Sequence, residues 1–296
     1  MSWEDTFSSW SNPPGQTEQD NMENAETAIK KAIANNDRLS DMDITVFAQG
    51  SYKANTSVKQ DSDVDVCVRL NSTFFTFYPA GKNDSDYNNI KGSISYAEYK
   101  NLVGEALTDY FGSKYITRGR KAFDIHSNSY RVDADVIPAF AYRRYFGNGH
   151  EDYIKPVGVA FIPDRGLRIE NWPEQNYSNG VDKNKATSLR YKKIVRILKN
   201  LRNDMQEENI DAANNIASFL IESLVWNTPN EGFGNSKLTD DVKYVLAHTF
   251  NDTRTDETCN EWGEVNELKY LFRPSQPWSR TQANNFLSAA WDYIGF

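Results

Sequence analysis

The sequence predicts an α+β protein with two lobes, a mixed-sheet N-terminal lobe and a helical C-terminal lobe. Short apolar strand patterns alternate with helical patterns up to about residue 137, whereas the pattern is helical throughout from about residue 185 onward. Such a division is typical of two packed lobes with a cleft between them. We expect residues 1–170 to form the first lobe and residues 171–296 the second.

The elements of the first lobe follow from the spacing of apolar residues. Helices are expected where these residues recur at every third or fourth position, and strands where they alternate with polar residues. The segment between the second strand and the second helix is rich in Gly, Asn and Asp, which is typical of a loop. In chain order the prediction is a helix over 17–36, strands over 44–48 and 64–70, a loop over 71–93 and a helix over 96–110.

The remaining elements are a hairpin and a series of helices. The turn residues Ser127-Asn128-Ser129 separate two strands, over 122–126 and 130–137. The segment 170–180, ENWPEQNYSNG, has the turn chemistry of a loop between the lobes. Helices are expected over 185–205, 211–226, 237–251 and 280–294.

The composition indicates an ordered globular protein. The 296 residues are 39% hydrophobic and 13% aromatic, enough to bury a sizeable core. No segment has the apolar length of a membrane span, and the N-terminus lacks the basic start and apolar run of a signal peptide. Because Cys67 and Cys259 are the only cysteines, a disulfide framework is excluded, and we expect a cytoplasmic protein with no membrane partner.

Two strands each carry a pair of aspartates. In the strand DVDVCVRL, the period of two sends the valines to one face and Asp63 and Asp65 to the other. In YRVDADVIPAF, Asp133 and Asp135 likewise share a face. Carboxylates gathered in a small space are tolerable when a hard divalent cation lies among them, and Mg²⁺ would be typical because it leaves positions for water and phosphate.

A second interpretation of one such pair is an exposed strand edge protected from aggregation by its charges. The presence of two pairs, one of them preceded by a Gly-Ser turn, favours the metal site. Gly50 lets the backbone approach a ligand closely, and Ser51 can donate to phosphate oxygens. Asp61, which lies between this turn and the strand, is outside the motif and is expected to be a loop residue.

The net charge of −8 argues against an extended nucleic-acid groove, because gripping long nucleic acid requires many phosphate contacts. One segment is nevertheless basic, with eight Lys or Arg residues between Lys183 and Arg202 and no acidic residue from 183 to 203. Lys192, Arg196 and Lys199 share one face of the predicted helix. Both a bound polyanion and a solvated helix face remain open as explanations.

The segments GSYKANT, DSDVDVCVRL and VDADVIPAF together resemble the motifs of the DNA polymerase beta-like nucleotidyltransferase superfamily. The resemblance implies a two-lobed polymerase beta-like nucleotidyltransferase fold, with the mixed-sheet lobe as the catalytic lobe. It implies that Asp63 and Asp65 are paired metal ligands and that Asp135 is the third ligand, with Asp133 as the alternative. Two Mg²⁺ ions are the cofactor it implies, and Mn²⁺ is a possible substitute.

The same resemblance implies residues that bind the nucleotide. VRILK is similar to a helix whose final lysine contacts the triphosphate, and SFLIE to a segment that supplies a serine and a stacking aromatic residue. Phe219 is also open to the simpler interpretation of a helix core residue. The nucleotide-binding residues implied are Gln49, Gly50, Ser51, Lys199, Ser218 and Phe219, with Asn171 and Asn176 as candidates beside the base.

Over roughly residues 12–226 the chain is most similar to bacterial cGAS/DncV-like nucleotidyltransferases. The resemblance implies an enzyme that makes a cyclic di- or trinucleotide second messenger from nucleoside triphosphates in antiphage signalling. Its partners would be nucleoside triphosphates and a downstream effector reached through the product, and we expect a monomer.

Other activities remain open from the sequence. One is template-independent transfer of a nucleotide to tRNA or another RNA end, as in CCA-adding enzymes. Another is a catalytically silent nucleotide-binding partner protein, and a third is nucleotidylation of a protein or an antibiotic. Analysis of the product would separate these activities.

Overall fold

The computed structural model describes residues 2–58 and 63–296. The described residues form two compact units. The sheet unit contains those of Gly15–Lys53 and Ser62–Glu174, and the helical unit contains those of Met1–Pro14, Ala54–Asp61 and Gln175–Phe296. Within the described residues, no helix is both long and apolar enough to span a membrane. The sequence-based division at residue 170 stays a prediction.

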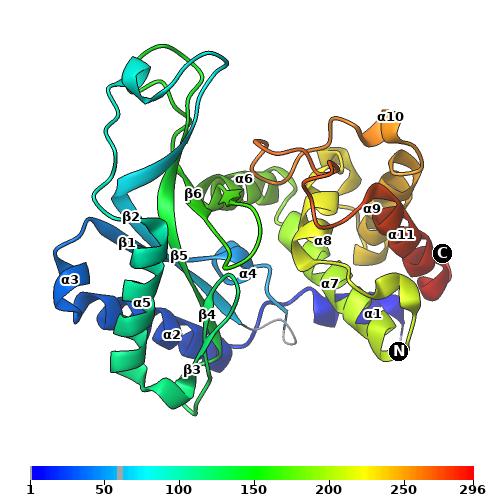
Figure 1. The fold of residues 1–296 in the computed structure, drawn as a ribbon. Helices are drawn as coiled ribbons and strands as arrows, with labels where there is room; N and C mark the ends of the chain where they lie inside the picture. The colour runs from blue at the N-terminus through cyan, green and yellow to red at the C-terminus, as the bar shows by residue number, and fades with distance from the viewer. Residues whose placement is uncertain (1, 59–62) are drawn as a thin grey trace. The chain divides into compact units, whose positions relative to one another are not determined.

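The sheet unit is built on a mixed sheet, as predicted (Figure 1). Among the described residues it has seven strands, in the order β1-β2-β5-β4-β3, with β6 paired to β5 and β7 paired to β6. The β2–β5 pair is parallel and the other pairs are antiparallel. The strands are β1 (Ile44–Gln49), β2 (Val64–Phe77), β3 (Ile116–Arg118), β4 (Phe123–Ile125), β5 (Ala134–Arg144), β6 (Gly158–Phe161) and β7 (Ile169–Asn171).

Two long helices, α2 (Gln16–Ala34) and α5 (Tyr96–Phe111), pack against the sheet and bury its valine face. Their apolar residues recur at helical spacing, so both predicted helices are confirmed. The hydroxyl of Tyr99 donates to the Val68 carbonyl at 3.1 Å, which ties α5 to a central strand. The short helices of this unit are α3 (Asp37–Ser40), α4 (Gly50–Ala54) and the 3₁₀ turns Asp84–Tyr87 and Ser113–Tyr115.

Strand β2 is longer than predicted. The expected loop over 71–93 is wrong for its first part, because the strand continues to Phe77 and pairs there with the C-terminal end of β5 (Figure 1). The register shifts between Leu70 and Phe74, which breaks the alternation on which the prediction relied. Beyond the shift, aromatic residues pack onto β5 neighbours, as Phe75 does with Phe140 at 5.3 Å between ring centroids.

The predicted hairpin is confirmed, since β4 and β5 pair antiparallel on either side of the Ser127–Ser129 turn. Asn128 bridges to Arg131 within it. The second strand begins at Ala134 and continues to Arg144, seven residues beyond the predicted end at 137.

The helical unit has a core that gathers around α7 (Figure 1). Ile194, Leu198 and Leu201 of that helix are fully buried. The N-terminal helix α1, which the sequence did not predict, packs Phe7 into the same core. The helices are α1 (Trp3–Trp10), α6 (Pro173–Ala186), α7 (Tyr191–Glu207), α8 (Ser218–Trp226), α9 (Leu238–Asp252), α10 (Asp256–Cys259) and α11 (Arg280–Ile294), with 3₁₀ turns at Asp211–Ala213 and Asn230–Gly232.

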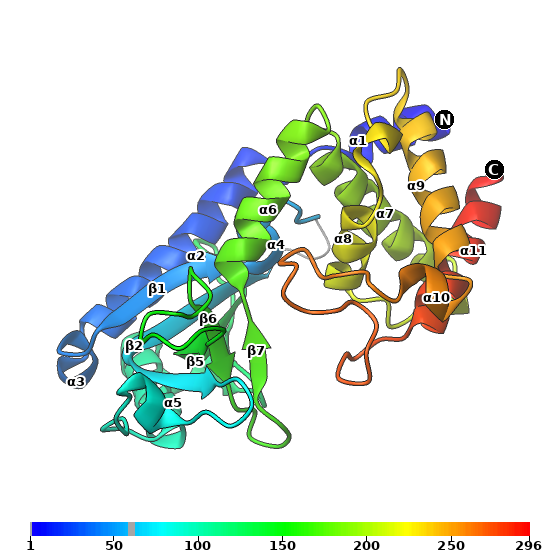
Figure 2. The same ribbon diagram turned by 90° about the horizontal axis from the view of Figure 1, so that it is seen from above.

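The region around residue 180 corrects the prediction. Segment 170–180 is mostly helix α6, which continues the chain from β7 (Figure 2), rather than a loop. This helix is so polar that its sequence shows no apolar period. The helix predicted to begin at 185 begins instead at Tyr191, because Ser188 and Leu189 adopt left-handed φ angles of 52° and 63° and break the helix. The helices expected over 237–251 and 280–294 are confirmed.

We expect opposite effects from alanine at two helical glycines. In α5, a Cβ on Gly104 would overlap the Phe123 ring, whereas in α6 a Cβ on Gly180 would make only an ordinary contact, 3.7 Å from Tyr191. Alanine gains about 1 kcal/mol of helix propensity at either position, but overpacking costs about 1–3 kcal/mol. Denaturant unfolding should show that Gly104→Ala destabilises and Gly180→Ala does not. Equal stabilisation by both would contradict this packing of α5.

Candidate active site

The end of β1 is shaped to approach a carboxylate. Gly50 has a φ of +65°, and a Cβ at this position would overlap Asp65 Oδ2. Both the backbone angle and the close approach therefore require glycine. The Gly-Ser turn of the sequence thus begins helix α4 directly against a predicted metal ligand.

The sheet register brings four side chains into one row. Asp65 of β2 lies opposite Asp135 of β5, and Asp124 of β4 lies opposite Asp135 on its other side. Gln49 of β1 pairs with Asp65 at the other end of the row. Because neighbouring residues of a strand alternate between faces, the row projects away from the valine face that α2 and α5 cover.

Burial and mutual repulsion make the charged forms of these carboxyls costly. Burial, with a smaller contribution from Asp63, raises the pKa of Asp65 from its ordinary 3.8 to about 6. Burial, followed by the charges of Asp124 and Asp65, raises the pKa of Asp135 to about 7. The row is therefore a place where added positive charge would be strongly stabilising.

The donor chemistry of this row fits a hard divalent cation. The ligands of the cation would be carboxylate oxygens of Asp63, Asp65 and Asp135. The buried Oε1 of Gln49 has no hydrogen-bond partner among the described residues. Within residues 2–58 and 63–296, no three His, Cys, Asp or Glu side chains already stand in the arrangement of a metal site.

The two candidates for the third ligand differ in their surroundings. Asp135 is half-buried in the carboxylate row. Asp133 is exposed, and its Oδ1 accepts a hydrogen bond from the Ser127 backbone N–H at 2.6 Å, so it stabilises the hairpin turn. These contacts favour Asp135 as the ligand.

Asp124 is a site residue that the sequence analysis missed. It forms a hydrogen bond with Asp135 and is half-buried. A single acidic residue between Phe123 and Ile125 gives no motif, although its alternation with two buried residues could have placed it on the polar face. Its proximity to Asp135 becomes evident only from the β4–β5 register.

In the helical unit, the basic helix α7 turns three of its cations inward. Arg196, Lys199 and Arg202 are 5%, 1% and 6% exposed, so a solvated face is the wrong explanation for them. Each binds backbone carbonyls: Arg196 those of Ser11 and Asn55, Lys199 that of Thr56, and Arg202 that of Ile216. Burial lowers the pKa of Arg196 to about 10, still well above neutral pH.

Lys199, a predicted triphosphate ligand, lies in a buried polar network. Its Nζ is 3.0 Å from the Thr56 carbonyl and 3.8 Å from Glu222 Oε2. The Thr56 hydroxyl donates to the same Glu222 oxygen at 3.0 Å. This network surrounds the ammonium inside the helical unit, where Lys199 is 1% exposed.

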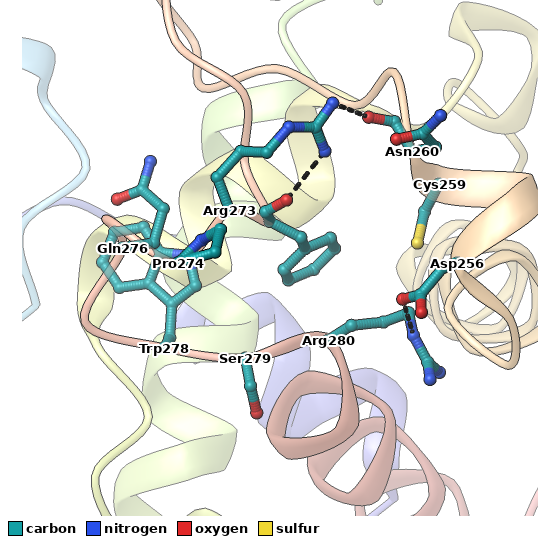
Figure 3. A pocket seen from close by; sticks show the side chains of 10 residues that line it. Asp256, Cys259, Asn260, Arg273, Pro274, Gln276, Trp278, Ser279 and Arg280 are labelled. Atoms are coloured by element: carbon teal, nitrogen blue, oxygen red, sulfur yellow. Dashed lines mark hydrogen bonds and ion pairs between the residues drawn. The ribbon is translucent and has the colours of Figure 1, made fainter.

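Ser218 and Phe219 begin helix α8. The hydroxyl of Ser218 accepts a hydrogen bond from Arg202 Nη1 at 3.0 Å. Phe219 is half-buried, with its ring centroid 6.4 Å from that of Trp278. Trp278 also lines a cavity of about 400 Å³, which Figure 3 shows among residues of α10 and the start of α11.

The candidates for the base pocket lie at the end of the sheet and in α6. Asn171 ends β7, opposite Val159 of β6, and is half-buried. Asn176 is in α6, and its buried Oδ1 has no hydrogen-bond partner in the part of the chain that the structure describes. Asp61 lies outside the described residues.

Comparison with known proteins places the chain in a family. Residues 178–295 match the model of the cGAS/DncV-like nucleotidyltransferase C-terminal helical domain. A cyclic dipyrimidine nucleotide synthase of Legionella pneumophila is 44% identical over 99% of this chain and 98% of its own. Another, of Cecembia lonarensis, is 38% identical over 99% and 98%. The chain belongs to the cGAS/DncV-like nucleotidyltransferase family.

A solved structure of this nucleotidyltransferase family agrees over the whole chain. The c-UMP-AMP synthase of Rhodothermus marinus, solved with Apcpp and Upnpp, has a TM-score of 0.86 at 29% identity, covering 99% of this chain and 97% of its own. These findings confirm the predicted family, the two-part α+β fold and the assignment as an enzyme. The roles of individual site residues stay predictions.

We expect the carboxylate row to make the metal-free protein less stable as the pH rises. The folded protein holds the Asp65 proton up to about pH 6, whereas the unfolded chain loses it near pH 3.8. The free energy of unfolding should therefore fall between about pH 4 and 6, by up to about 3 kcal/mol from this group. Urea unfolding in EDTA should show this fall, and Asp65→Asn should reduce it. A stability that rises over this range equally in both proteins would contradict the repulsion.

Replacing Gly50 by alanine should disable the site without removing any functional side chain. The new Cβ would displace the Asp65 carboxylate, and the left-handed φ adds strain of about 1 kcal/mol. We expect turnover to fall at least tenfold, roughly what a displaced catalytic group costs. Gly81→Ala is the matched control, because Gly81 has a φ of +80° and open space around its Cβ position. Equal losses of activity in both variants would show that strain alone is responsible.

Proposed function

We propose that this protein joins pyrimidine nucleoside triphosphates into a cyclic dinucleotide. The coarser activity, synthesis of a cyclic oligonucleotide from nucleoside triphosphates by nucleotidyl transfer, is that of the curated relatives. The choice of pyrimidines is supported by the two relatives at 44% and 38% identity, which are both named cyclic dipyrimidine nucleotide synthases. A relative named a cyclic dipurine nucleotide synthase is less similar, at 33%.

The observation that carries the mechanism is the pairing of Asp65 with Asp135. Asp63, Asp65 and Asp135 would hold two Mg²⁺ ions, for which Mn²⁺ could substitute. Such ions, when bound, supply charge neutralisation at the triphosphate and lower the pKa of an attacking hydroxyl. Asp135 would lie nearest the attacking hydroxyl, while Asp65, near the start of β2, and Asp63, directly before this strand, would hold the metals. Each of two successive transfers would form one phosphodiester bond and release pyrophosphate.

The remaining residues would bind and orient the nucleotides. In the sheet unit, the backbone N–H groups at Gly50 and the hydroxyl of Ser51 would donate to phosphate oxygens, with Gln49 beside them. In the helical unit, Ser218 and Lys199 would contact the triphosphate and Phe219 would stack on a base. Asn171 and Asn176 would read base edges through their amides.

We place this reaction in the cytoplasm, where nucleoside triphosphates are available. The product would act as a second messenger on a downstream effector in antiphage defence, and the enzyme would act as a monomer.

Product analysis tests this function. The protein is incubated with Mg²⁺ and radiolabelled UTP, CTP, ATP and GTP, singly and in pairs, and the products are treated with phosphatase and chromatographed. We expect a phosphatase-resistant cyclic product from UTP, CTP or both, lost in Asp63→Asn/Asp65→Asn. Asp133→Asn, which alters the hairpin aspartate, should retain product.

A product made only from purines would overturn the pyrimidine assignment but leave cyclic synthesis intact. A product that grows only when RNA is added would indicate transfer to a polynucleotide end. No product with any nucleotide and either Mg²⁺ or Mn²⁺ would contradict the mechanism.

A further inference from the structure

The start of helix α8 is held by an arginine from the preceding helix. Arg202 of α7 is 6% exposed, and its Nη1 donates both to the Ile216 carbonyl at 2.8 Å and to the Ser218 hydroxyl at 3.0 Å. The N-cap residue of α8 is Ala217, which has no side-chain group to cap the helix. Arg202 therefore organises the turn that leads into α8.

Arg202 is itself held in one orientation. Its Nε donates to Asn203 Oδ1 at 2.8 Å, and Asn203 is 7% exposed. Within residues 2–58 and 63–296, the buried Nδ2 of the same amide has no hydrogen-bond partner. If the Asn203 amide were turned over, its NH₂ would face the N–H of Arg202 Nε, and two donors would meet. The observed orientation therefore leaves Nδ2 unsatisfied, which costs free energy, but keeps the guanidinium in place.

The bond from Arg202 determines how Ser218 can act. A hydroxyl that accepts a hydrogen bond from a fixed guanidinium has its oxygen position set, and its own proton must point elsewhere. A cationic donor on the oxygen also polarises the O–H bond and makes it a stronger donor. These effects suit a hydroxyl that donates to an anion at the N-terminal end of a helix.

We propose that Arg202 is a positioning residue for nucleotide binding, which fixes the Ser218 hydroxyl so that it donates to an oxygen of the substrate triphosphate. The inference rests on the proposed function, because it takes Ser218 as a triphosphate ligand. It adds a residue that does not itself touch the substrate and that acts on the triphosphate through Ser218.

Other arginines of this unit show what a purely structural role looks like. In the cavity of Figure 3, Arg273 donates to the Phe272 and Asn260 carbonyls at 2.8 and 2.9 Å. It anchors two backbone segments, as Arg202 anchors Ile216, but it contacts no hydroxyl of the proposed site. Arg273→Gln is therefore the matched control for the loss of an arginine that anchors backbone.

The experiment measures binding by isothermal titration calorimetry with Mg²⁺ and two probes, a non-hydrolysable UTP analogue and UMP. The proteins are wild type, Arg202→Gln, Ser218→Ala, the double variant and Arg273→Gln. Arg202→Lys is added because it keeps the charge but lacks the second nitrogen, Nε, whose bond to Asn203 holds the guanidinium in one orientation. Thermal melting of each protein reports stability separately from binding.

Arg202→Gln and Ser218→Ala should each weaken binding of the UTP analogue by about tenfold, the effect of one hydrogen bond to a charged group. Binding of UMP should change little. The double variant should be no weaker than Ser218→Ala, because Arg202 acts through that hydroxyl. Arg202→Lys should fall between wild type and Arg202→Gln, and Arg273→Gln should bind like wild type.

Three results would overturn the inference. The first is that Arg202→Gln weakens binding of the UTP analogue as much in the Ser218→Ala background as in wild type. The second is that Arg273→Gln weakens this binding as much as Arg202→Gln does. The third is that Arg202→Gln weakens binding of UMP as much as binding of the UTP analogue. If Arg202→Gln does not fold, an Arg202→Lys variant that binds like wild type overturns the inference in the same way. If the wild type makes product and Arg202→Gln binds the UTP analogue as tightly as wild type, only this inference is rejected. A wild type that neither binds the analogue nor makes product rejects the proposed function as well.

Discussion

The parallel pairing of β2 with β5 is the constraint on which the proposed chemistry depends. It places Asp65 and Asp135 side by side, although seventy residues separate them in sequence. Repulsion between such neighbours makes their charged forms costly, and burial increases that cost. The backbone at Gly50 then approaches so closely that a Cβ at this position would overlap Asp65 Oδ2. The buried carboxylates destabilise this face of the sheet, and such destabilising clusters of charge are characteristic of functional sites that bind ions.

Whereas the sheet unit gathers carboxylates, the helical unit carries an excess of positive charge on helix α7. Arg196, Lys199 and Arg202 do not repel one another across solvent, because each is turned inward onto backbone carbonyls. These carbonyls belong to segments that lie far apart in sequence, near residues 11, 55 and 216. The basic helix is thus a structural centre of this unit, and through Arg202 it also reaches the hydroxyl of Ser218.

The sequence was informative where a single strand or helix carries the pattern. The alternation of Val64, Val66 and Val68 predicted both the strand and the face on which its aspartates lie. It could not predict the neighbours across the sheet, and Asp124 was missed because pairing of β4 with β5 alone places it beside Asp135. Polar helix α6 was missed because its sequence has no apolar period, and Gly180 is its one buried residue. The inward direction of the α7 cations depends on distant carbonyls that no local pattern encodes.

The central claim is that Asp63, Asp65 and Asp135 hold divalent cations against a bound triphosphate. The most direct test is a crystal structure with Mn²⁺ and a non-hydrolysable UTP analogue, in which anomalous scattering locates the metal. Our account predicts anomalous peaks bridged by carboxylate oxygens of Asp65 and Asp135 and in contact with phosphate oxygens. A nucleotide bound with manganese held by Asp133, or with no manganese at the paired aspartates, would contradict it.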